Sequence, residues 1–348
     1  MSYKVKRYLL WIIMLVSLLC VGYIAEGIIR IYTTFHARNV TADAVLLVPA
    51  GAGFEHVLDS LRAARVLLDE DTFIRAAQDE NYTQKVRPGR YKLTAGMSNR
   101  QLVRKLKTGA QDAVNVVVAG HIRDNGRLAA VLSRTIEADS ATIRHALADT
   151  HLLAGFGYTP ATLPAMIIPN TYEVYWTISA EQLLQRLHRE SQAFWNDTRT
   201  CQAAAIGLTR DEVATLAAIV NEETNKTDEM ARIAGVYINR LQQGMPLQAD
   251  PTLKYACRDF TMKRVLDRHK NIESPYNTYK HAGLPPGPIC IPSINAIDAV
   301  LQYEHHNYLY FCARDDFSGY HVFAITLAQH NQNAKRYHRA LNRMKRNA

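Results

Sequence analysis

Short motifs for binding metals or nucleotides are missing from this 348-residue chain. Its five cysteines include no C-x-x-C pair, which excludes the common zinc-ribbon and thioredoxin-type motifs and favours free cysteines packed as small hydrophobes. The histidines include no H-E-x-x-H, so no metal site and no cofactor are predicted. The segment Gly51-Ala52-Gly53 lacks the remainder of a G-x-G-x-x-G dinucleotide loop.

An excess of acidic residues and long blocks of one charge are also absent. The chain has 41 Lys and Arg against 32 Asp and Glu, a net charge of +9. With 48% hydrophobic residues it is not of the disordered class, and its length suits about two domains. A basic balance favours anionic partners, which include nucleic acid, anionic lipid and acidic polymers, without choosing among them.

One long apolar run lies near the N-terminus, at residues 8–29, and it is long enough to span a bilayer as a helix. Three basic residues precede it: Lys4, Lys6 and Arg7. The positive-inside rule therefore predicts a cytoplasmic tail at 1–7, a single transmembrane helix at 8–29 and export of the rest. A cleaved signal peptide or a lipoprotein signal at Cys20 are the alternatives, although no clear A-x-A site follows the run. Export excludes most nucleic-acid roles, so no nucleic-acid partner is predicted, and the cell wall is the nearest polymer.

The exported part predicts an α+β fold. A polar linker at 30–44 precedes two strand–turn–helix patterns, at 45–110 and 111–160. In the first pattern Ser98 reads as a helix N-cap and Gly109 as a helix stop. Residues 161–348 are richer in aromatics and turns and read as a mixed helix and strand catalytic domain. Its predicted elements are helices at 180–195, 210–224, 228–242, 294–304 and 328–346 and a strand at 308–313.

The helix predicted at 210–224 carries the most informative carboxylate. Thr209 and Glu212 form a capping-box pattern, which begins the helix. At 100° per residue Glu223 falls on the edge of the apolar stripe, whereas Glu222 points far from it and is expected to be solvated. Burial and the negative end of the helix dipole would both raise the pKa of Glu223, as a general acid requires. The alternative is a buried structural carboxyl.

Several segments in order resemble the YceG-like (MltG) family of endolytic murein transglycosylases. The segments are IIPNTYEVYW (167–176), IVNEET (219–224), AGVYINRL (234–241), GMPLQADPT (244–252) and SPYNTYKHAGLPPGPI (274–289). The resemblance covers nearly the whole chain. It implies a bacterial inner-membrane protein with its C-terminal part in the periplasm. It also implies a LysM-like α/β module at 45–110, a connecting segment at 111–160 and a YceG-like catalytic domain at 161–348.

The resemblance also implies a mechanism with one carboxylate. The position that matches the family's catalytic glutamate is Glu223, whereas the first acidic position of the family's segment is Asn221 here. Glu223 would protonate the oxygen between MurNAc and GlcNAc and then take the proton of the MurNAc O6 hydroxyl, which attacks C1 and leaves a 1,6-anhydro end. An intramolecular nucleophile has a high effective molarity, which reduces the need for a second carboxylate. The implied partners are nascent glycan strands, whose elongation the enzyme would terminate, and cell-wall synthases.

Eight further residues are candidates for binding substrate: Asn239, Gln248, Asp250, Thr252, Tyr276, Asn277, Thr278 and Tyr279. Asn239 would hold an N-acetyl group or orient Glu223, or else only link helices. Asp250 is either a second carboxylate or an Asx-turn before a proline. The aromatic, amide and hydroxyl groups at 276–279 suit a sugar-binding wall as well as an ordinary core.

Two other functions stay open at this point. A hydrolytic muramidase would use Asp250 as its second carboxylate. A non-catalytic peptidoglycan-binding membrane protein would use the LysM-like region and would not need Glu223.

Overall fold

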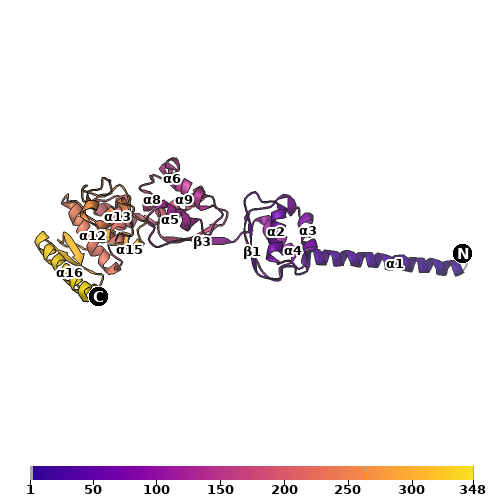
Figure 1. Cartoon of the computed structure of the whole chain (residues 1–348). Coiled ribbons are helices and arrows are strands. Elements are labelled where there is room, and N and C mark those ends of the chain that lie inside the picture. Colours follow the sequence, from indigo (N-terminus) through magenta and orange to yellow (C-terminus); the bar gives the residue numbers. More distant parts are fainter. Residues whose placement is uncertain (1–2, 263, 348) are drawn as a thin grey trace. The chain divides into compact units, whose positions relative to one another are not determined.

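The computed structural model describes residues 3–262 and 264–347 (Figure 1). Met1, Ser2, Lys263 and Ala348 lie outside the described residues, so the predicted tail at 1–7 is described only from Tyr3. The described chain is mostly helical and has three two-stranded sheets, in agreement with the predicted α+β class. It divides into two compact units, Met1–Val114 with Glu173–Ile178 and Asn115–Tyr172 with Ser179–Ala348.

The first unit begins with the apolar helix α1 (Tyr3–Ile31), which continues into a π-helical turn at Tyr32–His36. Within Arg7–His36 the most apolar window of 18 residues has a mean hydropathy of 2.4, and none of that window is buried against the rest of the protein. It is long and apolar enough to cross a membrane. A helix that is apolar all round and leaves that surface uncovered needs an apolar environment from elsewhere.

A small α/β core completes the first unit. Strands β1 and β2 pair antiparallel with Leu46 opposite Tyr91, and three helices cover the apolar side chains. Helix α4 begins with a capping box at Ser98 and ends at Gly109 in the left-handed conformation (φ 70°), as predicted. The elements are β1 (Ala44–Val48), α2 (Phe54–Ala64), α3 (Glu70–Asp79), a 3-10 turn (Tyr82–Gln84), β2 (Gly89–Leu93) and α4 (Asn99–Thr108).

Most helices of the chain belong to the second unit. Strands β3 (Ala113–Val118) and β4 (Asn170–Tyr175) pair with each other. The helices before the candidate site are α5 (Asn125–Leu132), α6 (Ser140–Ala148), α7 (Thr150–Gly155), α8 (Leu163–Met166), α9 (Ala180–Phe194) and α10 (Asp197–Ala205). Around the site lie α11 (Arg210–Glu223), α12 (Thr227–Gln242), α13 (Asp250–Ala256), α14 (Asp267–Lys270), α15 (Ile294–Leu301), β5 (Tyr310–Ala313), β6 (His321–Ala324) and α16 (Leu327–Asn347).

Helices α11, α12 and α15 pack together to form the core of the second unit. Each of α9 and α11 begins with a capping box, and Ser293 caps α15, so side chains satisfy the free N–H groups at these helix starts. The β5–β6 hairpin pairs Phe311 with Phe323 and packs against α16. The helices predicted in this region are confirmed, although α15 ends at Leu301, earlier than predicted.

Candidate active site

Helix α11 ends at the site. Every residue from Val213 to Val220 in the middle of the helix is buried, whereas the residues of its last turn are partly exposed. Glu223 is the last helical residue, and Thr224 leaves the helix in an extended conformation (φ −146°). The carboxyl is therefore held on a rigid element at the point where the chain turns away from the core.

The carboxyl of Glu223 accepts a hydrogen bond from the hydroxyl of Tyr237, at 2.6 Å. Tyr237 belongs to the buried face of α12, and the edge of its ring meets Phe311 of β5, with ring centroids 5.8 Å apart. Because Tyr237 is 2% exposed, its hydroxyl has little freedom to turn elsewhere. The hydrogen bond thus fixes the orientation of the carboxyl from the core side.

Burial raises the pKa of Glu223 from its usual 4.5 to about 7. The hydrogen bond from Tyr237 opposes this rise because it favours the carboxylate, whereas the charge of Asp250 adds to it. The raised pKa that the helical pattern predicted is therefore confirmed. A carboxyl poised between its two protonation states near neutral pH suits a group that first gives and then takes a proton.

Glu223 and Tyr237 line a cavity of about 410 Å³, called cavity A below. Its other walls come from α12, from the chain that follows it and from the C-terminal hairpin and helix, and include Arg240, Asp250, Tyr279, His321 and His330. Arg240 lies over the ring of Tyr310, 5.2 Å from its centroid, and donates to the backbone oxygens of Leu309 and Leu247. Cavity A is thus a polar cleft with rigid walls and one desolvated acid.

A buried hydrogen-bonded pair, Glu229 and His321, supports the wall of cavity A that His321 lines. Glu229 of α12 is 4% exposed and accepts two hydrogen bonds from His321, from the backbone N–H at 2.8 Å and from Nδ1 at 2.7 Å. The imidazole also meets the edge of Phe311, at 5.2 Å between ring centroids. Because Nδ1 is engaged by Glu229, Nε2 is the nitrogen left for a ligand in cavity A.

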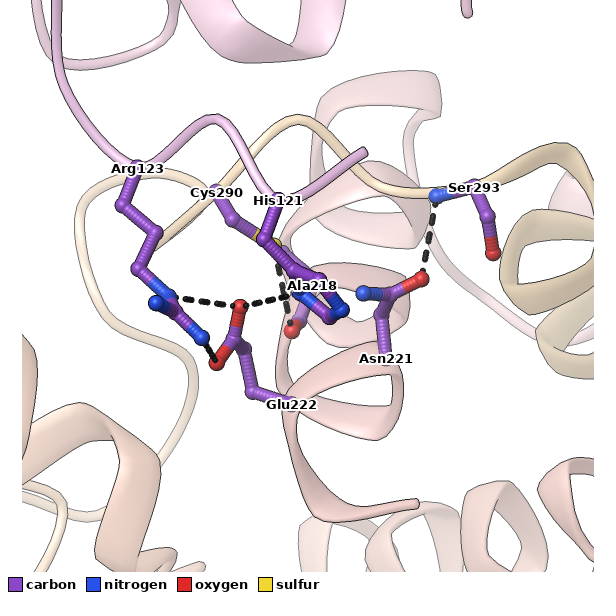
Figure 2. Close-up of polar contacts among 7 residues, drawn as sticks. All are labelled: His121, Arg123, Ala218, Asn221, Glu222, Cys290 and Ser293. Carbon is purple, nitrogen blue, oxygen red and sulfur yellow. Dashed lines mark hydrogen bonds and ion pairs between the residues drawn. The ribbon is translucent and has the colours of Figure 1, made fainter. Parts of the chain in front are cut away.

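Glu222 is paired rather than solvated, so the sequence prediction for this residue was wrong. Figure 2 shows Arg123 in a two-pronged contact with its carboxylate, Nε to Oε1 at 3.0 Å and Nη2 to Oε2 at 2.7 Å, with His121 Nδ1 at 3.3 Å. Burial alone would raise the pKa of Glu222, but the bonds and charge of Arg123 outweigh burial and lower it. The pKa values of the two adjacent glutamates are therefore shifted in opposite directions.

A second cavity, cavity B, of about 340 Å³, lies on this side of α11. His121, Arg123, Glu222, Glu223 and Lys226 are among its lining residues. Glu223 thus borders both cavity A and cavity B.

The remaining contacts in Figure 2 tie α11 to the segment before α15. The backbone N–H of Ser293 donates to Oδ1 of Asn221 at 3.3 Å, and the thiol of Cys290 lies 3.6 Å from the carbonyl oxygen of Ala218. Asn221, at the family's first acidic position, therefore has a bonding role at the start of a neighbouring helix. The five cysteines are all free, as expected, although Cys20 and Cys201 are exposed rather than packed.

Three of the predicted substrate-binding residues share cavity A with Glu223: Gln248, Asp250 and Tyr279. The hydroxyl of Tyr279 donates to Oδ1 of Asp250 at 2.6 Å, which holds the exposed carboxylate of Asp250 at the cavity wall. Gln248 adopts a left-handed backbone conformation (φ 50°), and its N–H donates to the carbonyl oxygen of Thr278. Such a conformation is costly for a residue other than glycine and is typical of functional sites.

The other predicted residues lie outside cavity A. The amide of Asn239 donates to the backbone oxygens of His306 and Tyr308, so it fastens α12 to the segment before β5. Thr252 and Thr278 are buried and bond to each other at 2.8 Å, and buried Asn277 donates to two backbone oxygens of its own loop. Tyr276 lines a different cavity, called cavity C, of about 750 Å³.

Sequence reasoning missed Tyr237, the Glu229–His321 pair and Arg123. A usable signal existed for Tyr237, because it falls on the apolar stripe of its helix with Ile233 and Ala234, where a hydroxyl needs a partner. For the pairs Glu229–His321 and Glu222–Arg123 no local signal existed, since their members are 92 and 99 residues apart in the chain.

Comparison with known proteins agrees with this architecture. A model of the YceG-like family matches residues 46–336. An endolytic murein transglycosylase of Bacillus subtilis (strain 168) is 28% identical over 314 residues, which cover 83% of each chain. Another of Streptococcus pneumoniae (strain ATCC BAA-255 / R6) is 27% identical, and the match covers 82% of this chain but only 57% of that longer protein.

A solved structure is also similar. The 2.6 Å crystal structure of a putative YceG-like protein from Listeria monocytogenes superposes with a TM-score of 0.55 at 25% identity. The match covers 84% of this chain and 99% of the other. With the family model matching most of the sequence, this chain belongs to the YceG-like family.

Proposed function

We propose that this protein is an endolytic lytic transglycosylase that cuts the MurNAc–GlcNAc bond of nascent murein glycan strands and leaves 1,6-anhydro-MurNAc ends. The observation that carries the proposal is the desolvated carboxyl of Glu223, held by Tyr237 between two cavities and with its pKa raised to about 7. The names of the relatives, endolytic murein transglycosylase, support the same substrate.

In the proposed reaction Glu223 acts twice. Its proton passes to the glycosidic oxygen as the C1–O bond breaks, and the GlcNAc end leaves as an alcohol. The O6 hydroxyl of the same MurNAc then attacks C1, and its proton returns to the Glu223 carboxylate. Atoms balance without water, and the acid is regenerated. A pKa near neutrality serves both steps because neither protonation state is strongly disfavoured.

Other groups of the site would hold the substrate. Gln248, Asp250 and Tyr279 line the cavity with Glu223 and are proposed to contact the sugar there. Thr252, Asn277 and Thr278 are proposed to act indirectly, since their buried hydrogen bonds hold the loop that carries Tyr279.

The proposed location is the inner membrane. We take α1 as a retained single-pass anchor, with the residues after it in the periplasm. Residues 45–110 would form a LysM-like module, 111–160 a connecting segment and 161–348 the catalytic domain. An anchored enzyme would cut strands as they emerge, so it would end their elongation next to the cell-wall synthases that make them.

A hydrolytic muramidase is the second candidate, because Asp250 lines the same cavity as Glu223 and its charge acts on that carboxyl. In such an enzyme Asp250 would act as base or nucleophile, and water would be consumed.

Mass spectrometry of the products separates these functions. Wild type, Glu223→Gln and Asp250→Asn would be incubated with uncrosslinked peptidoglycan strands. Anhydro-MurNAc ends made by wild type and lost in Glu223→Gln support the transglycosylase. Reducing ends that disappear in Asp250→Asn support the muramidase. No new ends with wild type, together with retained strand binding, would leave a non-catalytic peptidoglycan-binding protein.

A further inference from the structure

Three cavities of the second unit are linked by shared residues. Cavities A and B have Glu223 in common, and cavities B and C have Arg123 in common. Their volumes are about 410, 340 and 750 Å³. The carboxyl proposed to cut the strand therefore lies between two cavities rather than at the end of one, which suits an enzyme that must hold sugars on both sides of the bond.

Cavity C, the largest of the three, has walls suited to sugar rings. Tyr255 and Tyr276 lie with ring centroids 4.7 Å apart, and Phe260 lies 6.4 Å from Tyr255. All three side chains are half-buried, so each keeps some surface for a ligand. Aromatic faces with a few polar groups among them are typical of small-molecule sites, and they match the C–H faces of a pyranose.

Two arginines, Arg123 and Arg258, line cavity C, and Arg123 also lines cavity B. Arg123 is held by Glu222 (Figure 2). Its guanidinium also lies over Phe260, 5.1 Å from the ring centroid, so one side chain borders both cavities in a fixed position. Arg258 is exposed, and its guanidinium lies over Tyr255, 4.2 Å from the ring centroid.

The left-handed backbone of Arg258 (φ 52°) ends helix α13, and the N–H of the next residue, Asp259, donates to the carbonyl oxygen of Lys254. This helix end holds Arg258 beside Tyr255. A cation on an aromatic wall suits a ligand with both a sugar face and a carboxylate.

We propose that cavities A, B and C form one groove for a murein strand, and that cavity C binds a sugar of that strand away from the bond at Glu223. In this subsite Tyr255 and Tyr276 contact the sugar ring, and Arg258 binds a carboxylate of the peptide stem that MurNAc carries in a nascent strand. The inference rests on the proposed function and adds to it a preference for strands long enough to reach cavity C.

The dependence of cleavage on strand length tests whether the three cavities form one groove. The full chain in detergent micelles would be given uncrosslinked glycan strands of graded length, from tetrasaccharides upward, and kcat/KM measured for each. Wild type should prefer the long strands. Tyr255→Leu should lower kcat/KM on long strands by roughly three- to tenfold, the value of one aromatic contact, mainly through KM, and so reduce that preference.

Two further variants make the result interpretable. Arg258→Gln changes an exposed side chain and should weaken the preference without lowering the unfolding temperature. Tyr303→Leu is the matched control, because Tyr303 packs against the same core as Tyr255 but is not among the residues that line the three cavities. It should keep the wild-type dependence on length.

Equal kcat/KM on all lengths, or variants of Tyr255 and Arg258 that keep the wild-type preference, would overturn the groove while leaving the proposed function intact. Absence of cleavage by wild type would instead remove the proposed function. Direct binding of the same strands would then decide about the groove: affinity that rises with length and is reduced by Tyr255→Leu supports it, and affinity independent of length refutes it.

Discussion

Replacing Glu223 by glutamine should stabilise the protein at neutral and alkaline pH but not in acid. The pKa of this carboxyl rises from 4.5 to about 7 on folding because burial penalises its charged form. Below pH 4.5 the carboxyl is protonated in both the folded and unfolded chains and has no effect. Between 4.5 and 7 only the unfolded chain loses the proton, so the folded state loses stability as the pH rises.

The size of the effect follows from the two pKa values. At about 1.4 kcal/mol per pH unit, the interval from 4.5 to about 7 corresponds to a penalty of about 3 kcal/mol, complete above pH 7. Glutamine has nearly the shape of the protonated acid and still accepts the hydrogen bond of Tyr237, so its main effect is to remove this penalty. Glu223→Gln should therefore match wild type at pH 4 and exceed it by about 3 kcal/mol at pH 8.

Urea unfolding can report on the relevant unit. Trp195 is 4% exposed and belongs to the core that α11 and α12 share, so its fluorescence reports on that core. The other tryptophans, Trp11 and Trp176, would be changed to phenylalanine in every variant. Glu273→Gln is the control, because Glu273 is exposed and the hydrogen bond from Lys280 lowers its pKa, so no alkaline gain is expected. A gain for Glu223→Gln that is the same at pH 4 and pH 8 would refute the reasoning.

Three other changes have defined outcomes. Tyr237→Phe removes a hydrogen bond to the Glu223 carboxylate, and a hydrogen bond to a charged group is worth about 1.5–3 kcal/mol. The pKa of Glu223, about 7, sets the alkaline limb of the pH profile of kcat/KM, so this limb should move up by roughly one to two pH units. An alkaline limb that does not move in a folded variant contradicts this. Arg123→Met leaves Glu222 buried without its partner and should cost about 1–3 kcal/mol of unfolding free energy at pH 7. Because pairing lowers the pKa of Glu222, that cost should shrink below pH 4.5, and urea unfolding that shows the same cost at pH 7 and pH 3.5 would disprove the assignment. Gly235→Ala places a methyl group 2.7 Å from an imidazole nitrogen of the segment before β5, so it should lower stability by about 1–3 kcal/mol, and an unchanged thermal unfolding temperature would count against this close packing.

Local pattern was enough to predict α11 and the side of the helix on which the carboxyl of Glu223 lies. A capping box at Thr209 and a stripe of apolar residues depend only on spacings of three and four positions, and these spacings are the geometry of a helix. The same reasoning failed for Glu222. A helix wheel shows which side chains lie away from the apolar face of the helix, but not whether another segment of the chain covers them. Arg123 comes from a loop 99 residues earlier and covers that carboxylate.

The sequence by itself determined the apolar helix, the α+β class, the family resemblance and the candidate acid Glu223, since each depends on residue type and order along short stretches. Only the tertiary structure decided which groups surround that acid. Tyr237, His321 and Arg123 reach the site because helices and loops far apart in the chain pack on one core. Packing also separated the predicted substrate residues into those that line cavity A, such as Asp250, and those that only support it. Residues close together in the chain point in different directions, so a small difference in position decides whether a side chain faces solvent or core.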